Sequence, residues 1–156
     1  MPGDNRVVFR RVLIVLAALG LLVLGGFAAY TYMFSATTTY ANYSAPPFDA
    51  TATDEQRIFA LQTDLGNAAA EMAQLQTMAN KLQFGKMKAL GRHLQEVADE
   101  LEPRLAEIED REARRLLGEG IDGLRMVGEG SEDLDRDKSL RGVDQVLASF
   151  EALNNR

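Results

Sequence analysis

The chain contains no cysteine and only one histidine, His93. It therefore cannot form a disulfide, bind a metal through thiolates or attach a haem covalently. A Cys-His pair and the paired Glu-x-x-His motifs of di-iron bundles are excluded as well. No methionine shares a predicted helix face with His93, so we expect a partly exposed histidine on a helix flank rather than a haem ligand. No set of nucleophile, base and metal ligands converges, and we predict that the protein is not an enzyme.

Charge is missing from one long stretch near the N-terminus. Val12–Phe34 carries no charged residue, and a helix of this length, at about 1.5 Å per residue, spans the hydrocarbon core of a bilayer. Three arginines precede this run, whereas no charge follows it until Asp49. The positive-inside rule then predicts a cytoplasmic tail over residues 1–11 and a transmembrane anchor over residues 12–34.

A cleaved signal peptide is the alternative for this stretch, because a basic start followed by Val12–Leu24 resembles the first two regions of such a peptide. The nearest passable cleavage site, Thr39-Tyr40-Ala41, lies well beyond an apolar region that already exceeds the usual length of about 7–15 residues. We therefore predict a retained signal-anchor. The protein would be a single-pass protein of the cell inner or plasma membrane, with its C-terminal domain in the periplasm or outside the cell.

After the apolar run, acidic residues outnumber basic ones. Residues 35–156 hold 14 Lys and Arg against 22 Asp and Glu, a balance of −8. Like-charge repulsion argues against nucleic acid or anionic lipid as a partner of this part. The expected partners are membrane lipid around residues 12–34, and a protein partner or a second copy of the chain for the acidic part.

The acidic part divides into a linker and a helical domain. Residues 35–52 are rich in Thr, Ala, Tyr and Ser, contain Pro46-Pro47 and show no helical or alternating pattern, which predicts an extended tether. Thr53 and Gln56 have the spacing of a capping box, so a helix should begin there and open a domain over residues 53–156.

A heptad pattern follows the capping box and predicts a seam for coiled-coil-like packing. Its apolar positions alternate in steps of three and four, and two alanines make it shallow, which suits close helix contact. We predict an interaction surface on its larger members, Ile58, Leu61, Leu65, Met72, Leu75 and Leu82. Heptads pack equally well within a chain or between chains, so the sequence leaves both arrangements open.

Two breaks interrupt the helical pattern further on. The apolar positions slip by one residue around Gly85, which favours a hairpin turn over a local irregularity in one long helix. Pro103 would end a helix, but Leu101, Leu105 and Ile108 keep the same phase, which predicts a kink or a new helix along nearly the same axis.

The C-terminal part completes an all-α domain. Gly118, Gly120 and Gly123 each lower helix propensity by about 1 kcal/mol relative to alanine, so we expect the least rigid helix there. A last helix is predicted near Asp137–Leu153. The fold class is therefore all-α, with a single N-terminal transmembrane helix followed by an extracytoplasmic bundle of three or four helices.

An acidic segment between the last two predicted helices has partial EF-hand spacing. Residues that can supply oxygen ligands stand at positions 1, 3, 5, 7 and 12 of such a loop: Asp133, Asp135, Asp137, Ser139 and Asp144. However, Lys138 occupies the position that requires glycine, and the closing acid is an aspartate rather than the longer glutamate. The alternative is that Asp135 or Asp137 caps the last helix, which requires no ligand.

Two functions are consistent with these patterns. The first is a membrane-anchored structural or accessory subunit of an envelope complex, which would use the anchor and the heptad seam for helix packing. The second is a ligand-binding module that takes calcium at residues 133–144 or a small molecule within the bundle. No other cofactor is expected.

Overall fold

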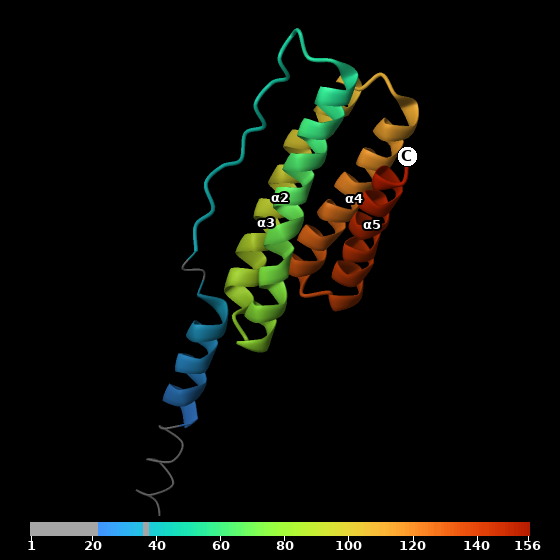
Figure 1. Ribbon diagram of the computed structural model, residues 1–156. Coiled ribbons are helices and arrows are strands. Elements are labelled where there is room, and N and C mark those ends of the chain that lie inside the picture. Colours follow the sequence, from blue (N-terminus) through green and yellow to red (C-terminus); the bar gives the residue numbers. More distant parts are fainter. Residues whose placement is uncertain (1–21, 36–37) are drawn as a thin grey trace, which may run out of the picture.

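The computed structural model describes residues 22–35 and 38–156, and every regular element in these residues is helical. Residues 22–34 form a helix that is followed by an irregular segment, and four long helices then run up and down as a bundle (Figure 1). The all-α bundle is confirmed. The elements in chain order are α2 (Asp54–Asn80), α3 (Phe84–Leu101), the 3₁₀-helix η1 (Glu102–Glu107), α4 (Arg111–Asp133) and α5 (Arg136–Asn154).

The start of α2 is the predicted capping box. The Thr53 hydroxyl accepts from the backbone N–H of Gln56 at 3.3 Å, and the Gln56 side chain accepts from the N–H of Thr53 at 3.0 Å. Two of the N–H groups that a helix start leaves without partners are thereby satisfied.

A tight turn joins α2 to α3, as the slip in the apolar pattern predicts. The residue in the left-handed conformation is Leu82, with φ 54°, and Gly85 instead lies in the first turn of α3. A Cβ on Gly85 would meet the backbone carbonyl of Phe34. The glycine is therefore needed because the end of helix 22–34 lies directly against α3.

At Pro103 the α-helix passes directly into η1, and the chain reverses direction only after η1, so the prediction that the next helix continues along nearly the same axis is wrong for α4 (Figure 1). Pro103 is the second residue of η1 (Glu102–Glu107), and the backbone becomes extended at Ile108, directly after its last residue. The Asp54 carboxylate of α2 accepts the N–H groups of Glu109 and Asp110, at 2.7 and 2.9 Å. Asp110 then caps α4 through the N–H groups of Glu112 and Ala113. A side chain from a distant helix thus fixes this turn, which local periodicity could not reveal.

The glycines of α4 are contact points with the neighbouring helices. A Cβ on Gly123 would lie 2.9 Å from the carbonyl oxygen of Gly142 in α5, and a Cβ on Gly128 would lie 2.6 Å from that of Gly91 in α3. Helix α4 packs on α2, α3, α5 and η1, and is the central helix of the bundle. The glycines that lower its intrinsic propensity let two other backbones approach it closely.

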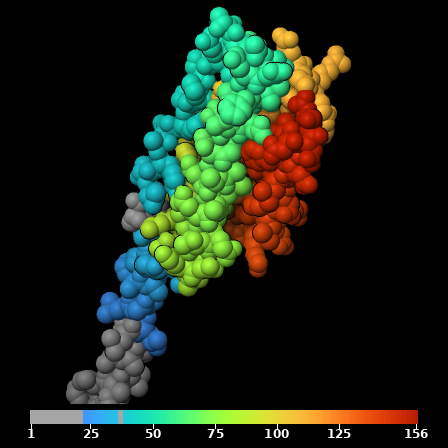
Figure 2. Space-filling view, viewed as in Figure 1, coloured from blue at the N-terminus to red at the C-terminus, as the bar shows by residue number. Residues whose placement is uncertain are grey.

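Residues 38–53, which we name the strap, contain no helix but lie along the bundle. Tyr40, Tyr43, Ala45 and Phe48 are half-buried and pack against the core. The strap covers one flank of α2, and α5 lies on the other side of that helix (Figure 2). The spacing of the strap's apolar residues follows neither helix nor strand, which is why the sequence predicts only a tether.

The predicted anchor extends beyond the described residues. Within residues 22–35 and 38–156, no helix combines the length and the apolar character that a bilayer crossing needs. Residues 12–21 of the predicted anchor and the predicted tail over residues 1–11 lie outside the described part of the chain.

The close approach of α4 and α5 is tested by two glycine substitutions with opposite expected effects. A Cβ at Gly142 would lie 2.6 Å from the Gly123 carbonyl oxygen and 2.7 Å from the Val127 nitrogen. Because backbone cannot move aside, Gly142→Ala should lower the free energy of unfolding by about 1–3 kcal/mol. At Gly118 the nearest atom is a Leu105 methyl at 3.5 Å. Gly118→Ala should therefore raise the free energy of unfolding by up to about 1 kcal/mol in urea titrations of the full chain. Equal effects would contradict this packing.

Candidate functional site

An apolar groove of about 680 Å³ opens between α2 and α5 at the end of the bundle that lies beside helix 22–34. Met72, Leu75 and Ala79 line it from α2, and Leu140 and Val143 line it from α5. Phe84 and Met87 of α3, and Leu134, which follows α4, add further apolar lining. The rim is polar, with Gln76, Asn80 and Arg136.

The groove exists because α2 and α5 meet only at the other end of the bundle. There the Phe150 ring lies on Gly66, 3.7 Å from the place of a Cβ, and Gln62 donates to the side chain of Asn154 at 3.2 Å. Further along, α2 packs on α3 and α4, and it has hardly any contact with α5. The two helices therefore diverge toward the end of the bundle near helix 22–34.

The predicted interaction seam is divided between core and groove. Leu61 and Leu65 are fully buried inside the chain's own bundle, and Ile58 is half-buried against the same core. Buried side chains offer no surface to a partner, so this half of the seam stabilises the fold. Met72 and Leu75 form part of the core and also line the groove. Leu82 has left the seam entirely and lies in the turn between α2 and α3 with 47% of its surface exposed.

The acidic segment is a helix junction rather than a closed twelve-residue loop. Asp133 ends α4, Asp135 caps α5 by accepting from the N–H of Lys138 at 3.0 Å, and Asp137, Ser139 and Asp144 lie within α5. Helical backbone over the second half of the segment separates these oxygens, so the EF-hand geometry is not formed. Among the described residues, no group of three or more acidic or histidine side chains could hold a metal ion.

Lys138 adds a positive charge within the same junction. Its ammonium lies 2.8 Å from the Glu129 carboxylate, and this hydrogen bond raises the pKa of Lys138 above its ordinary value. The ammonium of Lys138 thus occupies the junction beside Asp133 and Asp135, and Asp135 serves as the cap of α5. This arrangement corresponds to the capping alternative that the sequence left open.

His93 lies in a polar contact that sequence reasoning missed. Its Nε2 is 3.3 Å from a carboxylate oxygen of Glu71 in α2, and the ring of Tyr40 in the strap stacks on the imidazole with centroids 4.7 Å apart. The side chain of His93 is 11% exposed, as a flank position between two helices would leave it. The contact joins three segments that are far apart in the sequence.

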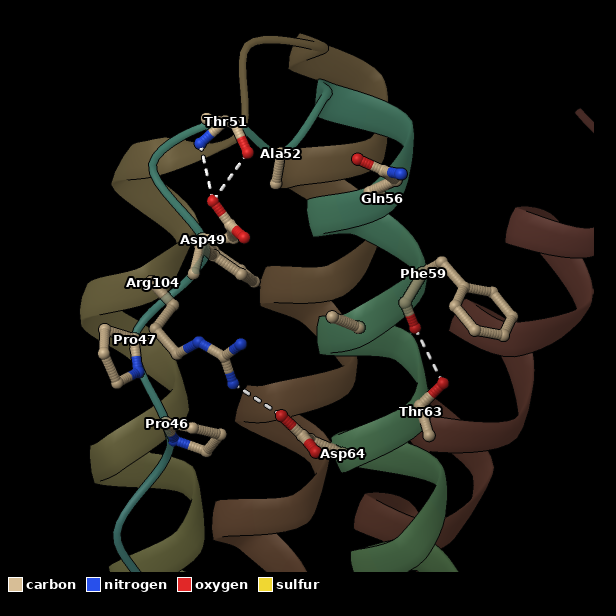
Figure 3. Close-up of a pocket in the computed structure, with 12 residues that line it drawn as sticks. Pro46, Pro47, Asp49, Thr51, Ala52, Gln56, Phe59, Thr63, Asp64 and Arg104 are labelled. Carbon is tan, nitrogen blue, oxygen red and sulfur yellow. Dashed lines mark hydrogen bonds and ion pairs between the residues drawn. The ribbon is translucent and has the colours of Figure 1, made fainter.

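A second polar contact lies further along the strap and lines a cavity of about 620 Å³ (Figure 3). Arg104 of η1 is buried, donates to the Asp64 carboxylate of α2 at 2.5 Å and has its guanidinium 4.1 Å from the centroid of the Phe48 ring. Pro46 and Pro47 form one side of the cavity, which is open to solvent. Arg104 is already paired with Asp64 and covered by Phe48, so this contact is best explained as the attachment of the strap.

The strap tyrosines predict how the fold responds to alkali. Burial raises the pKa of Tyr40 and of Tyr43, and the nearby carboxylates of Glu71 and Asp64 raise them further. A tyrosine whose pKa is higher in the folded protein than in the unfolded chain stabilises the fold at pH values below the unfolded pKa of about 10. This stabilisation is lost as the pH rises through the pKa of the folded protein. The double variant Tyr40→Phe, Tyr43→Phe should therefore lose less stability than the wild type between pH 9 and 11. Tyr30→Phe, at an exposed position, is the control for general alkaline unfolding.

The same variants probe the buried hydroxyls at neutral pH. Neither hydroxyl has a hydrogen-bond partner within the described residues. Their removal should leave the melting temperature at pH 7 unchanged or slightly higher, because a buried donor without a partner is destabilising. A marked loss would show that the hydroxyls are hydrogen-bonded and would contradict this account of the strap.

The capping interpretation of the acidic segment is tested by two alanine substitutions with and without calcium. Asp135→Ala should lower the free energy of unfolding by about 1 kcal/mol, because the cap of α5 is lost. Asp144→Ala, at an exposed helix position, should change it by less than about 0.5 kcal/mol. Millimolar calcium should leave the melting temperature of the wild type and both variants unchanged. A calcium-dependent rise that either substitution abolishes would instead establish the loop.

The comparisons with known proteins leave the chain without an assigned family. No family model matches it, and neither the curated proteins nor the solved structures contain a significant match. Its function therefore has to be inferred from its own contacts and surfaces.

Proposed function

We propose that this chain is a single-pass membrane protein whose N-terminus is cytoplasmic and whose helical bundle stands on the other side as a structural or accessory subunit of an envelope complex. Two observations support the anchor. The run Val12–Phe34 carries no charge, and Leu22, Val23, Leu24 and Phe27 of helix 22–34 are each about two-thirds exposed or more. Contiguous exposed apolar side chains of this size are typical of surfaces that contact lipid or another protein.

The open groove between α2 and α5 carries the subunit proposal. In a continuous four-helix bundle, α2 and α5 would pack together along their whole length. Here the two helices diverge and leave apolar side chains on both walls of the groove. We assign the groove to an amphipathic helix of a partner protein, which would lie between α2 and α5 with its apolar face inward.

Three features favour a helix as the occupant. Met72 and Met87 line the groove, and flexible methionines adapt to the shape of a bound helix. Ala79 is small and lets a second helix come close. The apolar lining is contributed by both α2 and α5, so a third helix between them could contact both walls.

A small apolar molecule is the second candidate. The groove volume of about 680 Å³ lies within the range of roughly 300–1,000 Å³ that is usual for small-molecule sites. Apart from Arg136 and Asp135 at the rim, its lining contains no charged group that would select one ligand.

The substitution Leu140→Asp tests the groove without opening the core, because Leu140 is 49% exposed. A carboxylate on the groove wall should abolish binding of a partner helix, because burying an unpaired charge costs several kcal/mol. The matched control is Phe59→Asp, which places the same charge on a 71% exposed residue at the other end of the bundle.

The readout is co-purification of the tagged full-length chain from its native membranes, with stoichiometry measured by mass spectrometry. We expect a protein partner at a fixed ratio with the wild type and with Phe59→Asp, and its loss with Leu140→Asp. If Leu140→Asp retains the partner, the partner binds at a surface other than the groove. Recovery of the wild type alone, with a small molecule detected by native mass spectrometry, would favour the second candidate.

A further inference from the structure

The turn between α2 and α3 places an exposed leucine at the end of the bundle that lies beside helix 22–34. Leu82 has φ 54° and is 47% exposed. It neither joins the hydrophobic core nor lines the groove. Left-handed backbone is strained for a leucine, and glycine or asparagine normally occupies such a position at a helix end. Leucine is thus unfavourable at this position for two reasons, because its backbone is left-handed and because its apolar side chain is exposed to water.

Leu134 provides an internal comparison. It has nearly the same backbone conformation, with φ 59°, and these two are the only non-glycine residues with positive φ in the described part of the chain. However, Leu134 lines the groove between α2 and α5, so packing accounts for its side chain. No such packing accounts for Leu82.

The surroundings of Leu82 are basic although the domain is acidic. Residues 72–95 contain Lys81, Lys86, Lys88 and Arg92 and no acidic residue. None of the three lysines forms an ion pair within the described residues. Around Leu134, by contrast, both signs of charge are present, with Asp133, Asp135 and Asp137 interleaved with Arg136 and Lys138. An exposed apolar side chain among unpaired lysines is therefore specific to one of the two turns.

The same turn contacts the end of helix 22–34. Gln83 lies 3.4 Å from the Tyr32 hydroxyl, and the rings of Phe34 and Phe84 have centroids 5.9 Å apart. Phe34 also ends the uncharged run that we propose as the anchor. If that run crosses the bilayer, its last residues lie at the membrane–water boundary, and the turn beside them lies at the depth of the lipid headgroups.

We propose that the α2–α3 turn docks on the bilayer surface, with Leu82 inserted among the upper acyl chains and Lys81, Lys86 and Lys88 against anionic headgroups. This inference rests on the proposed membrane anchor. The net charge of the domain does not prevent it, because charges separated by more than about 10 Å are screened at physiological salt. Each lysine near an anionic surface strengthens binding by about fivefold. The left-handed leucine is then explained as an apolar wedge where the helical bundle meets lipid.

The full chain contains no tryptophan, so a single introduced tryptophan is the only indole fluorophore. We would prepare Leu82→Trp, with Leu134→Trp and Phe59→Trp as controls in the α4–α5 turn and at the far end of the bundle. Phe27→Trp reports on the anchor itself. Each full-length variant is reconstituted into vesicles of phosphatidylcholine with or without phosphatidylglycerol, using lipids brominated near the headgroup end of their acyl chains as quenchers.

We expect strong quenching in Leu82→Trp and Phe27→Trp, and little in the two controls. Quenching of Leu82→Trp should fall when phosphatidylglycerol is omitted, and each change of Lys81, Lys86 or Lys88 to glutamate should weaken docking by about fivefold or more.

An unquenched Leu82→Trp beside a quenched Phe27→Trp would overturn the docking and leave the anchor intact. If neither is quenched and the chain does not float with the vesicles, the anchor itself is wrong. Equal quenching of Leu82→Trp and Leu134→Trp, or no dependence on anionic lipid, would overturn the specific role of this turn.

The variant Leu82→Gly separates docking from folding. Glycine relieves the left-handed backbone, so the melting temperature of the full chain in detergent should stay the same or rise. Docking should nevertheless weaken, which can be followed by quenching of a tryptophan at the neighbouring Gln83. A purely structural role of Leu82 predicts the reverse, with a lower melting temperature and unchanged quenching.

Discussion

Direct backbone contact between α4 and its two neighbours is the constraint on which the rest of this fold depends. Gly123 meets Gly142 of α5 and Gly128 meets Gly91 of α3, each at a distance that leaves no room for a side chain. Three helices are thereby joined with little side-chain material between them. The larger apolar residues, such as Leu117, Ile121 and Leu124, fill the remaining core, where they are almost completely buried.

Helix α2 occupies a different position because it carries no such glycine contact with α3 or α4. It packs through leucines on one face, and aromatic residues of the strap cover one of its flanks. On the other flank, the contact of Phe150 with Gly66 and one hydrogen bond from Gln62 to Asn154 hold one end of it to α5. The groove follows directly from this difference, since three helices pack tightly and the fourth is attached along only part of its length. The packed strap, together with the contacts of Tyr32 and Phe34 with the α2–α3 turn, predicts that the bundle keeps one orientation relative to helix 22–34.

Much of the fold follows from local sequence, and the parts that do not have physical reasons. Thr53 and Gln56 cap α2 through contacts within one helical turn, so their spacing alone identifies them. The reversal after Pro103 depends on Asp54, which lies more than fifty residues earlier in the chain, and no local pattern contains that information. Gly123 and Gly128 have unfavourable helix propensity, and their role becomes visible only when the facing backbone is known. For the site, the heptad seam correctly marks α2 as a packing helix, but it cannot tell which half is buried and which lines the groove.

The central claim is that the bundle has a fixed orientation relative to helix 22–34. Since the chain has no cysteine, introduced cysteines allow specific spin labelling at two exposed positions, Leu24 of helix 22–34 and Leu147 of α5. The distance distribution between these labels in the full chain, measured by pulsed electron paramagnetic resonance in lipid nanodiscs, tests the claim directly. Contacts of Tyr32 and Phe34 with the α2–α3 turn, together with the packed strap, predict a single narrow distribution. A broad distribution that spans many distances would show that residues 35–52 act as a loose tether and would contradict the account.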